Sequence, residues 1–239
     1  MKMNKLILLL FASFIFMKQV SASSDSCGLR ISLLTVTPGE ELYSVFGHSA
    51  LRVVDSASGT DIIYNFGTFD FSDPDFYSKF VRGKLLYSLS QETFQNFRYE
   101  NEYFHRGITE QVLSFNCNEK SLIQAKLFEN MQEENRYYKY DFLKDNCTTR
   151  LRDIIFGANS MSLNNKFLVS KTKSSYRDYL HFYLNRAEMP WTKLGIDLLL
   201  GLDSDALMNV TESMFLPDYL LKGVSLAKLA NKNLVAEEK

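Results

Sequence analysis

The sequence has no excess of charge of either sign, and it contains few histidines. Its 27 Lys and Arg side chains are balanced by 28 Asp and Glu side chains, which gives a formal net charge of −1. Such a chain has no electrostatic reason to bind a polyanion, so we expect no nucleic-acid partner. The three histidines, at positions 48, 105 and 181, lack the paired spacing of zinc ligands. We therefore expect no metal and no other cofactor.

The hydrophobic run at the N-terminus is short. It extends from Leu6 to Met17, twelve residues, whereas a membrane-spanning helix needs about 20. Lysines precede the run and small residues follow it at positions 20–22, which is typical of a secretory signal peptide. We expect a signal peptide over residues 1–22 and export of the rest. Residues 23–239 should form a single domain, because no internal repeat or low-complexity linker divides them.

Cysteine is also scarce, with three residues in the whole chain. An odd number in an exported protein leaves at least one thiol without an intramolecular partner. Cys27 precedes the first predicted strand and Cys117 follows the apolar run 112–115, so both lie at strand ends. The sequence therefore predicts a disulfide between Cys27 and Cys117 and a free thiol at Cys147.

Hydrophobic patterning predicts an α+β fold, with a small, mainly antiparallel sheet flanked by helices. The predicted strands are residues 29–36, a hairpin over 48–66, residues 84–90 and residues 107–115. The predicted helices are residues 38–45, 72–82, a stretch within 92–104, 119–132 and a helix that starts near residue 147. From about residue 170 we expect a helical C-terminal part, with helices over 175–185, 190–202 and 217–230. The helix at 38–45 is predicted from Thr37-Pro38-Gly39-Glu40, which has capping-box spacing with proline at the first helical position.

The segment DFLKDNCTTRLRD, residues 141–153, places Cys147 where a helix should begin. Asp145 and Asn146 are good N-cap residues, so the thiol falls in the first helical turn. The amide N–H groups and the positive end of the helix dipole favour a thiolate there, and they are suited to hold an oxyanion. The alternative is a buried structural cysteine, which behaves as a small hydrophobic residue. The polar neighbours of Cys147 favour a reactive thiol and a nucleophilic role.

His48 is the best candidate for a base that would work with this thiol. It follows Gly47 at the start of a predicted strand, which is a rigid support, whereas His105 lies at a helix end and His181 lies within a helix. Asn65, on the returning strand of the hairpin, should lie on the same face as His48 and orient its imidazole. The alternative role for Asn65 is to serve the turn that follows it.

Three further residues are expected to contact substrate. Arg150 lies three residues after Cys147 on the same helical face, where it would meet an anionic group or form an ion pair with Asp145 or Asp153. Tyr43 and Asn146 flank the two motifs that carry His48 and Cys147. The apolar segment 190–202 has two possible roles, a lipid-facing edge or internal packing, and we expect internal packing.

Four segments carry a family resemblance: LLTVTPGEELYSVFGHSALRV, IYNFGTFDF, ENRYYKYDFLKDNCTTRLRD and MFLPDY. Together they resemble a family of exported Bacteroidota proteins identified as lipoprotein N-acyltransferases of the Lnb type. The order of His before Cys is also similar to the lecithin:retinol acyltransferase and phospholipid N-acyltransferase group, which implies a circularly permuted papain-like core with Cys147, His48 and Asn65 as its catalytic residues. Family members usually carry alanine where Thr148 stands, and they tend to continue with membrane segments after the region that ends here.

The resemblance implies a specific reaction. An acyl chain would move from a membrane phospholipid, through a Cys147 thioester, to the α-amino group of a diacylglyceryl-cysteine at a lipoprotein N-terminus. The implied partners are the phospholipid donor, the diacylated lipoprotein acceptor and the membrane surface. The implied location is the periplasm, at the outer face of the inner membrane. Two alternatives remain: an envelope cysteine peptidase or amidase that acts on cell-wall peptides, and a non-catalytic lipid-binding or lipoprotein-binding module.

Overall fold

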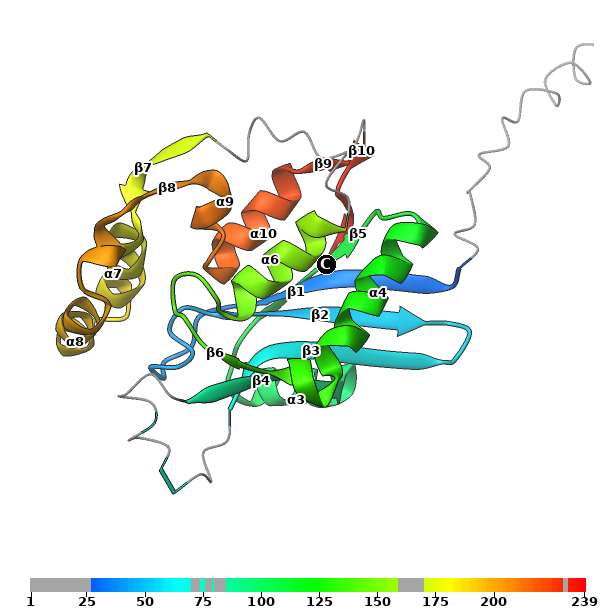
Figure 1. The fold of residues 1–239 in the computed structure, drawn as a ribbon, viewed down its shortest axis with the longest axis horizontal. Coiled ribbons are helices and arrows are strands. Elements are labelled where there is room, and N and C mark those ends of the chain that lie inside the picture. Colours follow the sequence, from blue (N-terminus) through cyan, green and yellow to red (C-terminus); the bar gives the residue numbers. More distant parts are fainter. Residues whose placement is uncertain (1–26, 70–73, 76–78, 80–84, 159–169, 230–231) are drawn as a thin grey trace, which may run out of the picture.

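The computed structural model describes residues 27–69, 74–75, 79, 85–158, 170–229 and 232–239. Its main feature is a seven-stranded antiparallel sheet in the order β11-β5-β1-β2-β3-β4-β6 (Figure 1). The strands are β1 Leu29–Val36, β2 His48–Asp55, β3 Thr60–Thr68, β4 Leu86–Thr93, β5 Ile108–Leu113, β6 Tyr137–Lys139 and β11 Val235–Glu238. The predicted α+β class with an antiparallel sheet is confirmed. The predicted signal peptide and most of the predicted helix at 72–82 lie outside the described residues.

Helices cover both faces of this sheet. On one face lie α4 (Cys117–Met131), α6 (Cys147–Gly157) and α10 (Pro217–Leu226), and on the other lies α3 (Phe94–Tyr103), as Figure 1 shows. Side chains of β1 alternate between the two layers, because successive residues of a strand point to opposite faces. Ile31 and Leu33 pack with the three helices, whereas Leu34 and Val36 pack with Phe97 of α3. This double coverage explains why β1 is buried from Ile31 to Val36.

The C-terminal part is mostly helical, but strands interrupt it. The predicted helices correspond to α7 (Tyr176–Arg186), α8 (Pro190–Leu200) and α10. The short elements of this part are β7 Lys171–Ser175, the 3-10 helix η1 Gly201–Asp205, β8 Leu207–Asn209, α9 Val210–Ser213, β9 Lys228–Leu229 and β10 Lys232–Asn233. One further short helix, α5 Glu133–Arg136, lies earlier in the chain, just before β6. The chain then returns to the main sheet, where β11 pairs with β5. This edge strand was not predicted, because its short polar sequence has no strand-like alternation and its pairing partner lies more than a hundred residues away.

The helix predicted at residues 38–45 is wrong, since the segment forms hydrogen-bonded turns. Thr37, the expected cap, instead bonds Gly107 twice: its N–H donates to the Gly107 carbonyl at 2.9 Å, and its Oγ1 accepts from the Gly107 N–H at 2.9 Å. The Gly39 N–H donates to the carbonyl of Ser44, and the Ser44 N–H donates to that of Glu41. Because the N–H and the Oγ1 of Thr37 are both hydrogen-bonded to Gly107, Thr37 does not cap a helix over the residues that follow it.

A second apolar cluster joins the C-terminal helices to two loops of the main domain. It contains Val45 and Phe46, from the loop before β2, and Leu143, from the loop before α6. Its remaining buried members come from the C-terminal part: Tyr176, Leu180, Tyr183, Leu184, Met208, Phe215 and Leu216. We call this set the second core. It fixes both loops that lead to the candidate site against a common support.

Candidate active site

The site lies where β2 and β3 stop pairing with each other, a point that we call the opening of the β2–β3 ladder. Pairing between these strands runs from Asp55↔Thr60 to Leu51↔Tyr64, and beyond this point His48 and Ser49 pair with β1. The first turn of α6 occupies the opening. Gly67 of β3 lies against this turn, since a Cβ there would be 3.4 Å from the Cβ of Cys147, at about contact distance. Its φ of +87° favours glycine.

Cys147 is the first residue of α6, as the sequence predicts, and Asn146 is the N-cap. The Asn146 Oδ1 accepts hydrogen bonds from the N–H groups of Thr148 at 2.8 Å and Thr149 at 2.9 Å. Thr149 completes a capping box, because its Oγ1 accepts from the Asn146 N–H at 2.8 Å. The cap therefore uses two of the N–H groups that were expected to hold an oxyanion, but it does not use the N–H of Cys147.

His48 and Asn65 lie together on one face of the sheet. His48 Nε2 donates to Asn65 Oδ1 at 3.1 Å, which leaves Nδ1 as the ring nitrogen available to Cys147; the imidazole and the thiol are close enough for each to shift the pKa of the other. The Asn65 amide donates in turn to Glu92 Oε1 at 2.5 Å. The structure thus brings together all three residues predicted to be catalytic. Glu92, in β4, was not predicted, and only the pairing of β3 with β4 brings it into the chain of hydrogen bonds.

The thiol and the imidazole shift one another's pKa. Burial alone raises the pKa of Cys147, but the charge of His48 and hydrogen bonds from His48, Thr148 and the Ser49 N–H bring it below its ordinary value. Burial alone lowers the pKa of His48, but the charge and hydrogen bond of Cys147 and the hydrogen bond to Asn65 raise it above its ordinary value. These opposite shifts favour a thiolate–imidazolium pair.

The thiolate has a further hydroxyl neighbour in Thr148. Its Oγ1 lies 3.7 Å from the sulfur and 3.4 Å from Ser49 Oγ. An alanine at this position would lack the hydroxyl, so Thr148 adds a hydrogen bond to the thiolate in this chain. Cys147 itself is half-buried and is the free cysteine of the structure, whereas Cys27 and Cys117 form the predicted disulfide, with Cα atoms 5.6 Å apart.

Two of the three residues predicted to bind substrate, Arg150 and Asn146, make polar contacts within the protein. Arg150 forms a two-point ion pair with Asp145, at 2.6 and 2.8 Å, and stacks 3.6 Å above the ring of Tyr138. Of its two predicted roles, the structure therefore favours the ion pair. Asn146 is buried, and its amide donates to the carbonyls of Phe142 and Phe215. The prediction that Asn146 contacts substrate is not supported, because its side chain is used inside the fold.

Tyr43 is exposed on the loop before β2, as a substrate or surface contact would require. The ring of Tyr138 is more directly placed, because its hydroxyl lies near Gly67, beside Cys147. This hydroxyl is buried, and its oxygen lies close enough to the backbone of Gly67 for that hydrogen bond to oppose the rise of its pKa. Burial raises the pKa of Tyr138 far above its ordinary value, so the group remains a protonated donor.

The chain matches the Lnb N-terminal periplasmic domain family over residues 16–185. It belongs to this family. The match includes strands β1 to β7, the N-terminus of α6 and the three residues that meet at the site, and it ends one residue before the last residue of α7. Strand β11 of the main sheet lies beyond it. Comparisons with curated proteins and with solved structures found no match.

Membership of the Lnb N-terminal periplasmic domain family places the protein in the periplasm. Among the described residues, no helix is both long enough and apolar enough to cross a membrane. Nor does any group of three or more His, Cys, Asp or Glu side chains in the described ranges have an arrangement that would hold a metal ion.

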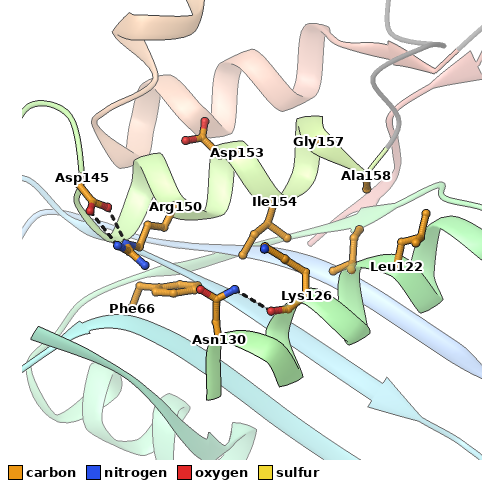
Figure 2. A pocket seen from close by; sticks show the side chains of 11 residues that line it. Phe66, Leu122, Lys126, Asn130, Asp145, Arg150, Asp153, Ile154, Gly157 and Ala158 are labelled. Carbon is orange, nitrogen blue, oxygen red and sulfur yellow. Dashed lines mark hydrogen bonds and ion pairs between the residues drawn. The ribbon is translucent and has the colours of Figure 1, made fainter. Parts of the chain in front are cut away.

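A cavity of about 500 Å³ lies between α4 and α6 (Figure 2). Its position differs from that of the thiol, since neither Cys147 nor His48 lines it. The Arg150–Asp145 pair lies at one end, and Ile154 and Phe66 contribute apolar side chains. The other lining residues are Leu122, Ile123, Lys126, Asn130, Asp153, Gly157 and Ala158. The cavity runs beside α6, whereas the candidate chemistry lies at the N-terminus of this helix.

Proposed function

We propose that this protein is a cysteine-dependent acyltransferase that moves an acyl chain from a membrane phospholipid to the N-terminal amine of a diacylated lipoprotein. The observation that carries the proposal is the pairing of Cys147 with His48 at a helix N-terminus, with Asn65 orienting the imidazole. Membership of the Lnb family and the periplasmic location support the choice of substrates. We propose that this arrangement is a papain-like centre and, because His48 precedes Cys147 in the chain, that the fold is a permuted form of the papain-like fold.

The first half-reaction forms a thioester. The Cys147 thiolate attacks the carbonyl carbon of a phospholipid ester, and the carbonyl oxygen becomes an oxyanion. When the intermediate collapses, the bond from carbon to the glycerol oxygen breaks. The protonated His48 donates its proton to that oxygen, which releases a lysophospholipid. The acyl group is then bonded to sulfur, and His48 is neutral.

The second half-reaction reverses the proton transfer. The α-amino group of the lipoprotein attacks the thioester carbonyl, and neutral His48 accepts the proton that the amine loses. The bond from carbon to sulfur breaks, an amide is released, and the thiolate–imidazolium pair is restored. Two donors are suited to hold the oxyanion in both steps: the Cys147 N–H, which the cap leaves unused, and the protonated hydroxyl of Tyr138.

Intact-protein mass spectrometry after incubation with phosphatidylethanolamine tests the proposal. We expect a trapped acyl adduct on Cys147, which hydroxylamine removes, and no adduct on a Cys147→Ser variant. His48→Ala should form the adduct at least about 100-fold more slowly, since general acid and base catalysis contributes about that much or more. His105→Asn is the matched control, because asparagine tolerates the positive φ of that position. A Cys147→Ser protein that still N-acylates lipoproteins would refute the mechanism, and an adduct formed only with cell-wall peptides would favour a peptidase or amidase.

A further inference from the structure

Helix α8 carries most of its large apolar side chains outward, which reverses the usual arrangement of a surface helix. Trp191, Leu194, Leu198 and Leu199 of α8 and Leu202 of η1 are between 50% and 87% exposed. They recur at helical spacing along one side, and we call this set the outward stripe. The stripe contains no charged residue. The expectation that segment 190–202 packs internally is wrong for these five side chains.

The inward side of α8 holds the charge and fixes the helix in place. His181 Nε2, in α7, lies 2.8 Å from Asp197 Oδ1, and Arg177 forms an ion pair with the same carboxylate. Ile196 and Leu200 pack against the second core. Polar and apolar contacts thus hold α8 against α7, and the outward stripe is presented by a helix that is already anchored.

The outward stripe lies at the same end of the molecule as the candidate site. Ile196 and Leu200 of α8 share the second core with Phe46, just before His48, and with Leu143, just before Cys147. Figure 1 shows α7 and α8 at the end where β2 begins. Leu42 and Tyr43, on the loop before β2, add exposed apolar side chains close to the site, at 54% and 61% exposure.

We propose that the outward stripe, together with Leu42 and Tyr43, is the surface by which this domain docks on a phospholipid bilayer. The inference rests on the proposed function for its substrate, because a phospholipid ester must reach Cys147 from a membrane. Uncharged leucines with a tryptophan at one end suit the boundary between acyl chains and head groups, where indole rings are favoured. Docking by this end would bring the opening of the β2–β3 ladder to the lipid.

The test uses the fluorescence of Trp191, which is the single tryptophan of the sequence. The protein would carry Cys147→Ser, so that binding is measured without chemistry. Vesicles of phosphatidylethanolamine and phosphatidylglycerol should shift the Trp191 emission to shorter wavelength, and brominated acyl chains should quench it. An unshifted and unquenched emission in the presence of vesicles would overturn the proposal.

Two double variants identify the docking surface. Leu198→Glu with Leu199→Glu should weaken vesicle co-sedimentation at least about tenfold, since the transfer of each leucine from water contributes more than this factor requires. Tyr99→Glu with Tyr103→Glu, on exposed positions of α3, should leave it unchanged. Equal losses in both variants would overturn the proposal, as would analytical ultracentrifugation showing that the leucine variant abolishes a dimer rather than vesicle binding.

The same variants on the Cys147 background separate this proposal from the proposed function. If the leucine variant forms the acyl adduct from vesicles as fast as the parent, docking by the outward stripe is refuted while the acyltransferase proposal stands. If the stripe binds vesicles but no adduct forms on Cys147, docking stands and the proposed function fails. Unchanged alkylation of Cys147 by iodoacetamide in both double variants would show that the site remains folded.

Discussion

Replacement of His48 by alanine should reverse the direction of the Cys147 pKa shift. Burial raises the pKa of this thiol, and the charge and hydrogen bond of His48 are the main groups that bring it below its ordinary value. Without the imidazole, burial is opposed by the weaker effects of Thr148, the Ser49 N–H and the N-terminus of α6. We therefore expect the thiol pKa of His48→Ala to lie above the ordinary value of about 8.5.

The size of the effect follows from the contacts that are lost. A hydrogen bond to a charged group contributes about 1.5–3 kcal/mol, and about 1.4 kcal/mol corresponds to one pKa unit. At pH 6 the thiolate fraction should therefore fall about 10-fold to 100-fold from this hydrogen bond alone. Since a more basic thiolate is also a better nucleophile, with a Brønsted coefficient of about 0.4–0.5, the midpoint of the pH profile is a better measure than a single rate.

The assay is the rate of Cys147 alkylation by iodoacetamide between pH 4 and pH 10. The alkylation rate of the parent should reach half its maximum below pH 8.5, and that of His48→Ala above pH 8.5. The rate profile of His105→Asn should match that of the parent. Asn65→Ala should lie between the two, because it leaves the imidazole but removes the acceptor that fixes Nε2. A His48→Ala profile that coincides with the parent would show that the helix N-terminus alone ionises the thiol, and the assigned base would be wrong.

Four further outcomes follow from the structure. The rate of acyl transfer should show a bell-shaped dependence on pH. It should rise as the thiol, whose pKa is lowered, ionises, and it should fall as His48, whose pKa is raised, loses its proton. A rate that keeps rising above the pKa of His48 would exclude imidazolium as the proton donor. Glu92→Gln should move the falling limb to lower pH, because the carboxylate charge that favours imidazolium is lost, and an unmoved limb would limit Glu92 to a structural role. Asn146→Ala should reduce the free energy of unfolding by about 3 kcal/mol in urea titrations, since a helix cap and two buried hydrogen bonds disappear; a loss under 1 kcal/mol would contradict this. Cys27→Ser with Cys117→Ser should reduce it by about 4 kcal/mol, because the bridge closes a loop with a sequence separation of 90, and an unchanged urea midpoint would argue against the disulfide.

The three residues of the site come from three different elements that are spread over the chain. His48 begins β2 and Cys147 begins α6, so both lie at element ends. Asn65 lies within β3, one residue beyond the last residue that pairs with β2. Element ends leave N–H groups and side chains that are not used by the sheet or helix. The antiparallel hairpin then brings His48 and Asn65 together, and α6 enters the gap between the strands.

Local signals were sufficient for part of this arrangement. The Asn-Cys pair before an apolar stripe predicted the start of α6, and strand alternation predicted that His48 and Asn65 share a face, because both signals act within a few residues. Glu92 could not be found in this way. Its contact with Asn65 depends on the register between β3 and β4, which no local sequence signal specifies.

The sequence by itself determined the larger helices and the strands β1 to β5, the disulfide pairing from strand ends, and a thiol placed at a helix start beside a polar cap. Only the tertiary structure decided that Thr37 pairs with Gly107 instead of capping a helix, that β11 returns to the sheet, and that α8 turns its leucines outward. These outcomes depend on contacts between residues far apart in the chain. Local propensity is weak beside such contacts, because one hydrogen bond or buried side chain is worth as much as the preference of several residues for a helix.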